Sequence, residues 1–157
     1  MAHIPINHPL RPFYRAVSGL CGVLILAFGV MGAIASTGDD FFSRESIWAL
    51  WMRTNMAFSL VSILIGAVLA AGYVIGGDLS HWINYYGSWV LLAGGLAGIA
   101  VLRTDLNIFN WSMVNAIVWL VIGTLVLTAG LYDKAGPPEP ARTEGALRRN
   151  QVTPAKG

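Results

Sequence analysis

Four long stretches without a charged side chain dominate the sequence and limit what the chain can fold into. They lie between Arg15 and Asp39, Arg53 and Asp78, Asp78 and Arg103, and Asp105 and Asp133. A bilayer core about 30 Å thick is crossed by about 20 helical residues, so each stretch is long enough to span it. With 55% hydrophobic and 11% charged residues, the chain is not a soluble globule. The sequence predicts an all-α integral membrane four-helix bundle.

The charge-free stretches place the helices at residues 16–36, 55–76, 82–102 and 107–132, within a transmembrane domain over 16–133. Residues 1–15 precede it as an extended segment at the membrane surface, because Pro5, Pro9 and Pro12 disfavour a helix before Phe13. Residues 134–157 are rich in proline, glycine and charge and lack apolar periodicity. We expect this segment to be a disordered, flexible cytoplasmic tail.

The basic residues predict the orientation of the spans. Seven lysine and arginine residues lie on the side of the two termini, and three lie on the other side. The positive-inside rule therefore predicts a multi-pass protein of the plasma membrane with both termini in the cytoplasm. An even number of spans agrees with this orientation.

The second and fourth spans share a sequence pattern. Arg53-Thr54-Asn55 and Arg103-Thr104-Asp105 each open an apolar stretch, and Ile65-Gly66 and Ile122-Gly123 follow in the same order. A duplicated helical hairpin in parallel orientation would produce this pattern. Two unrelated membrane helices of similar composition would also produce it, so both interpretations stay open.

Small residues mark places where membrane helices can approach each other closely. Gly94 and Gly98 form a GxxxG pattern, as do Gly72 and Gly76. In lipid, such a face packs against another helix of the same bundle or against a partner protein. The pattern favours internal packing, with a partner surface as the second possibility.

Polar side chains within the spans form a further pattern. Asn55, Ser59 and Ser62 share one helical face, and Asn110 and Asn115 lie near the start of the last span. Amides in lipid need hydrogen-bond partners, so these residues should face the bundle interior or another protein. A hydrophilic pore is the alternative, although no span has an ionisable group at its middle, where ion pathways usually place one.

Common catalytic patterns are missing from the sequence, including the phosphate-binding loop, G-x-S-x-G, H-E-x-x-H and C-x-x-C. His3, His8 and His81 lie near the predicted cytoplasmic ends of the spans, so haem ligation inside the bundle is not expected. His81 is expected at the headgroup level, in contact with water or lipid. We expect no catalytic residue, cofactor or metal. A membrane enzyme would require an essential residue among His81, Arg103 and Asp105.

Several local motifs resemble a known family. These are NHPLRPFYR at 7–15, RTN at 53–55, HWIN at 81–84 and RTDLNIFNWS at 103–112. Together they are similar to a family of small four-transmembrane-helix proteins, a domain of unknown function that is frequent in actinobacteria. The resemblance covers residues 2–133 and brings no catalytic residues with it. It further implies a place in the cytochrome bcc–aa3 respiratory supercomplex, where a similar protein is an association factor packed against larger haem-bearing subunits.

The sequence and the resemblance together favour a non-catalytic accessory subunit that stabilises or bridges a larger membrane complex. The expected partners are membrane lipids and larger integral membrane subunits, cytochrome bcc and the aa3 oxidase among them. A net charge of +2 is too small to indicate nucleic-acid binding. The alternative is a small transporter or channel-like protein that acts as a homo-oligomer. The candidate interface residues are Pro9, Arg11, Phe13, Tyr14, Gly94, Gly98, Asn110 and Asn115.

Overall fold

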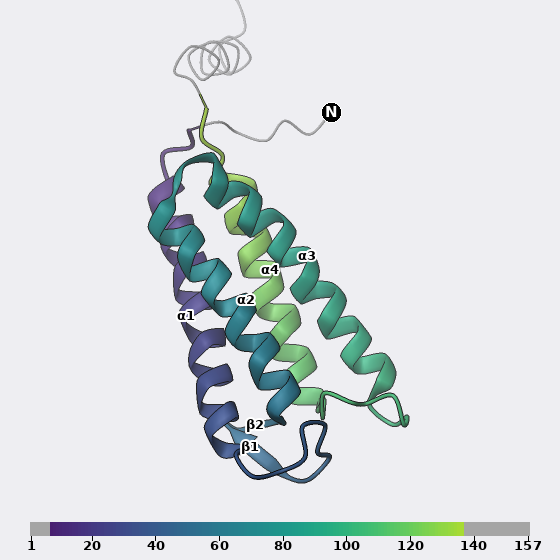
Figure 1. Cartoon of the computed structure of the whole chain (residues 1–157). Helices are drawn as coiled ribbons and strands as arrows, with labels where there is room; N and C mark the ends of the chain where they lie inside the picture. The colour runs from purple at the N-terminus through teal and green to yellow at the C-terminus, as the bar shows by residue number, and fades with distance from the viewer. Residues whose placement is uncertain (1–6, 137–157) are drawn as a thin grey trace, which may run out of the picture.

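A computed structural model describes residues 7–136 of the chain (Figure 1). This part contains four helices and one hairpin, in the order α1 (Arg11–Ala35), β1 (Ile47–Ala49), β2 (Met52–Thr54), α2 (Met56–Ile75), α3 (Gly77–Val101) and α4 (Met113–Tyr132). Residues 1–6, and residues 137–157 of the predicted tail, lie outside the described residues. The prediction of an all-α helical bundle is confirmed.

Three helices in the described part of the chain are long and apolar enough to cross a membrane: α1, α2 and α4. The sequence predicts four such spans. The helix α3 has 25 residues, but its first half carries Asp78, His81 and Asn84, which lower its mean hydropathy. The protein is therefore a multi-pass helical membrane protein, and α3 is the long helix outside the set of candidate spans in the described residues.

Two helices begin earlier than predicted. The first starts at Arg11 rather than at residue 16, so the prediction of an extended segment over 1–15 is wrong from Arg11 onward. Pro12 lies in the first turn, where a missing N–H removes no intrahelical hydrogen bond. The helix α3 starts at Gly77 rather than at residue 82, because Gly76 and Gly77 turn the chain with φ of +69° and +66°.

The last helix begins later than predicted, at Met113 instead of residue 107. Ser112 is its N-cap, and its hydroxyl accepts a hydrogen bond from the Asn115 N–H at 3.3 Å. The preceding residues form turns, in which the Asn107 side chain bonds to both the N–H and the carbonyl of Trp111. Local side-chain bonds of this kind compete with helix formation.

The helices pack as two pairs, α1 with α2 and α3 with α4. A Cβ atom on Gly66 of α2 would lie 2.4 Å from the backbone nitrogen of Leu26 in α1. A Cβ atom on Gly130 of α4 would lie 2.8 Å from the nitrogen of Tyr85 in α3. Only glycine permits this approach of backbone to backbone, which brings many atoms into van der Waals contact.

The two pairs bury equivalent positions. A shift of 57 residues relates α2 to α4, and a shift of 66 residues relates α1 to α3. The buried pairs are Gly66 with Gly123, Leu69 with Val126, Ser18 with Asn84, Ile25 with Leu91, Gly29 with Gly95 and Gly32 with Gly98. Contacts also join α1 to α4 and α2 to α3. The repeated order of buried positions supports the interpretation as a duplicated hairpin, which stays a prediction.

The correspondence also corrects the sequence pattern. Ile65-Gly66 and Ile122-Gly123 do occupy equivalent positions. The segment aligned with 53–55, however, is 110–112, when the shift of 57 residues that relates α2 to α4 is extended to the residues before these helices. Asn55 caps α2, whereas Asp105 lies in the exposed loop before α4 and caps nothing. The similarity of RTN and RTD is therefore unrelated to the repeat.

Candidate functional site

A buried carboxylate lies where α1, α3 and α4 meet. Asp133 directly follows α4 and is fully buried. Its Oδ1 accepts a hydrogen bond from Arg11 Nε at 3.1 Å, and its Oδ2 accepts one from the Ser80 hydroxyl. Arg11 also donates through Nη2 to the Gly77 carbonyl at 3.2 Å. These bonds tie the first turn of α1 to the end of α4 and the start of α3.

The polar contacts continue into the bundle through Asn84. Its Nδ2 lies 3.4 Å from Ser80 Oγ and 3.5 Å from Asp133 Oδ2, and its Oδ1 accepts a hydrogen bond from Ser18 Oγ at 2.5 Å. Ser18, Ser80, Asn84 and Asp133 are all buried. We call Arg11, Ser18, Ser80, Asn84 and Asp133 the terminal polar cluster.

Electrostatics explain why the Asp133 carboxylate is tolerated there. A negative charge at the C-terminus of α4 is unfavourable, because the helix dipole is negative at that end. The Arg11 guanidinium compensates for it, and the hydroxyl of Ser80 brings the carboxylate to the first turn of α3, where the dipole is positive. The cluster is thus charge-balanced and works as a tie between helices.

His81 lies beside this cluster and is buried, so the prediction that its side chain contacts water or lipid is wrong. Its side chain is 2% exposed, and Nδ1 lies 2.6 Å from the Gly130 carbonyl oxygen. The carbonyl is an acceptor, which assigns the proton to Nδ1. His81 therefore bonds the start of α3 to the last turn of α4.

At the opposite end of the bundle, asparagine side chains hold the loops together. Asn110 Nδ2 donates to the carbonyls of Glu45 and Thr54, both at 2.8 Å. Asn115 bonds to both backbone groups of Arg53, accepting from its N–H at 3.2 Å and donating to its carbonyl at 2.6 Å. The amide of Asn115 thus pairs with β2 as a neighbouring strand would.

Asn55 completes this arrangement. Its Oδ1 caps α2 by accepting from the Phe58 N–H at 2.9 Å, while its Nδ2 donates to the carbonyls of Ser43 and Ile108 at 3.1 and 2.7 Å. We call Asn55, Asn110 and Asn115 the asparagine clamp. The prediction that the polar residues of α2 face the bundle interior is confirmed, since Asn55, Ser59 and Ser62 are all buried.

Four predicted interface residues are engaged inside the chain. Asn110 and Asn115 belong to the asparagine clamp and are buried. A Cβ atom on Gly94 would lie 2.8 Å from the Trp119 ring, and one on Gly98 would lie 2.6 Å from the Trp111 ring. These four positions pack α3, α4 and the loops against one another, and their role at a partner surface stays a prediction.

The four predicted interface residues at the start of α1 divide into two kinds. Pro9 and Phe13 are exposed, and the Phe13 side chain is 61% accessible. Arg11 instead belongs to the terminal polar cluster. The Tyr14 ring stacks on Tyr132, with ring centroids 4.8 Å apart. Pro9 and Phe13 thus stay available for an external contact.

The tip of the β-hairpin presents an exposed tryptophan, Trp51. The strands pair with Trp48 opposite Arg53 and Ala49 opposite Met52, which leaves Leu50 and Trp51 as a two-residue loop. Both loop residues have positive φ, 46° and 60°, a geometry that a two-residue hairpin favours but that glycine or asparagine normally supplies. Leu50 lines a pocket between α1 and α4, whereas Trp51 is 87% exposed.

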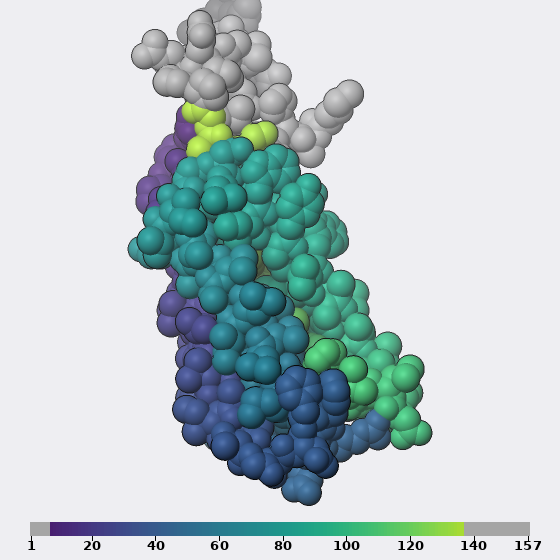
Figure 2. Space-filling view, in the orientation of Figure 1, coloured from purple at the N-terminus to yellow at the C-terminus, as the bar shows by residue number. Residues whose placement is uncertain are grey.

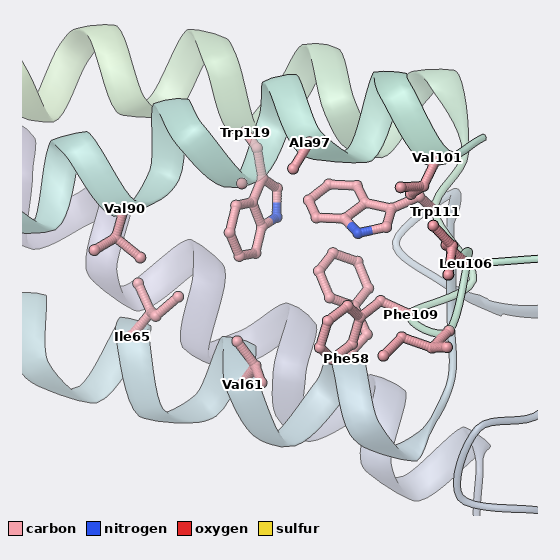
Figure 3. Close-up of a pocket in the computed structure, with 12 residues that line it drawn as sticks. Phe58, Val61, Ile65, Val90, Ala97, Val101, Leu106, Phe109, Trp111 and Trp119 are labelled. Atoms are coloured by element: carbon pink, nitrogen blue, oxygen red, sulfur yellow. The ribbon is translucent and has the colours of Figure 1, made fainter. Parts of the chain in front are cut away.

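An apolar pocket of about 320 Å³ lies between α2 and α3, next to the loop that precedes α4 (Figure 3). The rings of Phe58, Phe109, Trp111 and Trp119 gather at one end of it, as Figure 3 shows. The surface is hollowed between α2 and α3 on the face seen in Figure 2. No charged residue lines the pocket, so it is suited to an apolar ligand.

Within residues 7–136, no group of three or more His, Cys, Asp or Glu side chains is placed to hold a metal ion. Comparisons of the chain with family models, with curated proteins and with solved structures find no match.

Two features escaped the sequence analysis. The first is Asp133, a carboxylate that directly follows an apolar helix. Arg11, in the first turn of α1, was an available partner for it. The Leu50-Trp51 loop had no signal, because neither residue is typical of a hairpin turn.

Proposed function

We propose that the chain is a non-catalytic accessory subunit of a larger membrane complex, which it stabilises or bridges. The observation that carries this proposal is the hairpin tip. Left-handed backbone at a bulky residue costs on the order of 1–3 kcal/mol and is maintained where the surrounding structure fixes it, often at contact sites. Here Trp51 has this conformation and is 87% exposed.

The remainder of the chain supports the proposal by forming a rigid frame. Among the described residues, Ser36 Oγ and Arg53 Nε are the buried side-chain polar atoms that lack a hydrogen-bond partner. The side chains of Asn55, Asn110 and Asn115 bond within the chain, and this asparagine clamp fixes the base of the hairpin. A frame of this kind holds an exposed anchor at low entropic cost on binding.

The resemblance noted in the sequence suggests the partner: the cytochrome bcc–aa3 supercomplex of the plasma membrane. The charge distribution favours cytoplasmic termini. Because the start of α1 and the end of α4 lie together, at the opposite end of the bundle from the hairpin, this orientation puts Trp51 on the outer side. The proposed contact is thus made from the outer half of the membrane.

Native-size separation of membranes solubilised in a mild detergent tests this proposal. The protein is followed by mass spectrometry and haem by absorbance. The wild-type chain should migrate with haem-containing bands, and Trp51→Ala should move it to smaller species. Trp89→Ala is the matched control, because Trp89 is 52% exposed on α3, away from the hairpin. Migration of the wild-type chain alone as a small oligomer would refute the proposal.

The transporter alternative has one specific observation in its favour, the fully buried carboxylate of Asp133. Buried ionisable groups in membrane domains often mark proton or ion pathways. Proteoliposomes containing the purified chain would then show ion flux that Asp133→Asn abolishes and Asp105→Asn leaves unchanged. Absence of flux with the wild-type chain would remove this alternative.

A further inference from the structure

Two apolar pockets lie at equivalent seams of the duplicated bundle. The α1/α4 pocket has a volume of about 190 Å³ and is lined by α1, the hairpin and α4. The α2/α3 pocket has about 320 Å³ and is lined mainly by α2, α3 and the loop before α4. The shifts that relate the hairpins also pair the lining residues: Leu24 with Val90, Phe28 with Gly94, Met52 with Phe109, Val118 with Val61 and Ile122 with Ile65.

The two pockets differ in the size of the residues on one wall. In α1 this wall carries Leu24 and Phe28, whereas the equivalent wall of α3 carries Val90 and Gly94. The smaller residues leave the α2/α3 pocket with the larger volume. A void without occupying atoms loses the dispersion contacts of its lining, so an open pocket at this seam needs an occupant.

The surroundings determine the chemistry of that occupant. The lining residues from α2 lie in a helix long and apolar enough to span the membrane. The medium at that depth is lipid hydrocarbon, and water gains no partners in such a pocket. Trp111 and Trp119 line the pocket with 6% and 4% exposure. Of the tryptophan indole N–H groups in the described residues, only that of Trp82 donates a hydrogen bond within the chain. The indole N–H groups of Trp111 and Trp119 are therefore available to the ester carbonyl of a lipid.

A positive charge lies close to the pocket in the chain. Arg103 is exposed in the loop between two lining residues, Val101 and Leu106. The nearby carboxylate of Asp105 pairs with Arg44 Nη1 at 3.3 Å. Arg103 forms no ion pair with the described residues, which leaves it for an anionic headgroup at the membrane surface.

We propose that the α2/α3 pocket binds an acyl chain of an anionic phospholipid, with the phosphate held near Arg103. The chain enters laterally between α2 and α3, and the ester carbonyls reach the level of Trp111. This inference does not rest on the proposed function, because it concerns the chain on its own. The seam between the two hairpins is then a lipid site on the α2/α3 side, and on the α1/α4 side it holds the smaller pocket of about 190 Å³.

Native mass spectrometry of the full chain in mild detergent, titrated with dioleoyl phosphatidylglycerol, tests the proposal. The wild-type chain should retain one phospholipid. Ala97→Phe should weaken binding about tenfold, because the added ring fills the pocket that Ala97 lines. Ala93→Phe is the matched control, since Ala93 is exposed on the same helix but does not line the pocket, and it should bind as the wild type does.

Arg103→Gln provides a second variant, in an exposed loop where the bundle is not disturbed. It should lower the preference for phosphatidylglycerol over phosphatidylcholine while one lipid is still retained. Equal lipid binding by the wild type and Ala97→Phe would overturn the acyl-chain site. An unchanged headgroup preference in Arg103→Gln would overturn the role of Arg103, and retention of an uncharged isoprenoid instead of a phospholipid would overturn the choice of ligand.

Discussion

Ser18 and Asn84 occupy equivalent positions in the two helical hairpins and hydrogen-bond to each other, with Ser18 Oγ 2.5 Å from Asn84 Oδ1. A residue can contact its own equivalent only beside a twofold axis. In a duplicated bundle the axis would therefore pass through the terminal polar cluster. In α1 the position holds a small hydroxyl, and in α3 it holds an amide that reaches on to Asp133.

Removal of the Asp133 carboxylate should destabilise the bundle. Asp133→Ala leaves Arg11 and Ser80 without their hydrogen-bond acceptor. We expect the free energy of unfolding to fall by about 2–4 kcal/mol, because the carboxylate is fully buried while Arg11 is partly exposed. Thermal unfolding in detergent, followed by circular dichroism, measures it. Asp105→Asn removes an exposed ion pair and should cause no measurable change. A melting temperature of Asp133→Ala equal to that of the wild type would contradict the assigned role.

Equivalent glycines should respond differently to alanine. The Cβ of Gly66→Ala would lie 2.4 Å from the Leu26 backbone nitrogen, so the helices must separate, at a cost of about 1–3 kcal/mol. The Cβ of Gly123→Ala would meet the Leu92 side chain at 3.0 Å, and that side chain can rotate away. Chemical or thermal unfolding of the two variants compares them, and equal losses would argue against backbone contact at Gly66.

The asparagine clamp should control the mobility of the hairpin. Asn115→Leu preserves the size of the side chain but leaves the backbone N–H and carbonyl of Arg53 unpaired. Each unpaired group should lower the free energy of unfolding by about 1–3 kcal/mol. Hydrogen exchange should accelerate across residues 47–54 and remain slow in α1 and α2. Thr124→Ala serves as control on the same helix, since its exposed hydroxyl bonds only to the Leu120 carbonyl. Unchanged exchange in the hairpin would exclude the clamp as its support.

Substitution of Trp51 at the hairpin tip should have opposite effects on the stability of the isolated protein and on its association with the larger complex. Trp51→Gly removes left-handed strain at an exposed side chain, so the isolated protein should be as stable as the wild type or more stable, by up to about 1 kcal/mol. The same change should weaken association with the larger complex. Unfolding of the purified variant and its migration in native separations measure the two effects. A clear loss of stability would show that Trp51 supports the bundle itself.

The orientation of the chain gives a further expectation. The native Cys21 is buried, so a cysteine introduced at an exposed site reports its own side of the membrane. With cytoplasmic termini, Asp39→Cys should react with an impermeant maleimide in intact cells, and Asp78→Cys should react only after lysis. Both positions are exposed and lie at opposite ends of the bundle. The reverse pattern of labelling would invert the proposed topology.

The sequence was sufficient for the number and order of the helices, because charge-free stretches depend only on composition along the chain. It was insufficient for the start of α4, since the charge-free stretch includes Asn107 and Asn110, whose side chains bond to backbone groups outside a helix. A hydropathy pattern does not register such local bonds.

The candidate sites were harder to predict for a similar reason. Asn110 and Asn115 were correctly identified as groups that need partners, but the partners are backbone groups of β2, more than fifty residues away. The burial of Asp133 depends on its ion pair with Arg11, which lies 122 residues earlier in the sequence. Pairings of this kind follow from the tertiary fold and have no signature in the order of residues.

The bond between Arg11 and Asp133 also has a consequence for biosynthesis. The first helix emerges from the ribosome long before its partner carboxylate does, so Arg11, Ser80 and Asn84 reach the membrane without the group that joins them. The bundle closes only when the end of α4 has been inserted. A chain truncated just before Asp133 would keep four helices but leave Arg11 and Ser80 without their acceptor, and a bundle destabilised in this way is a target for quality-control proteolysis.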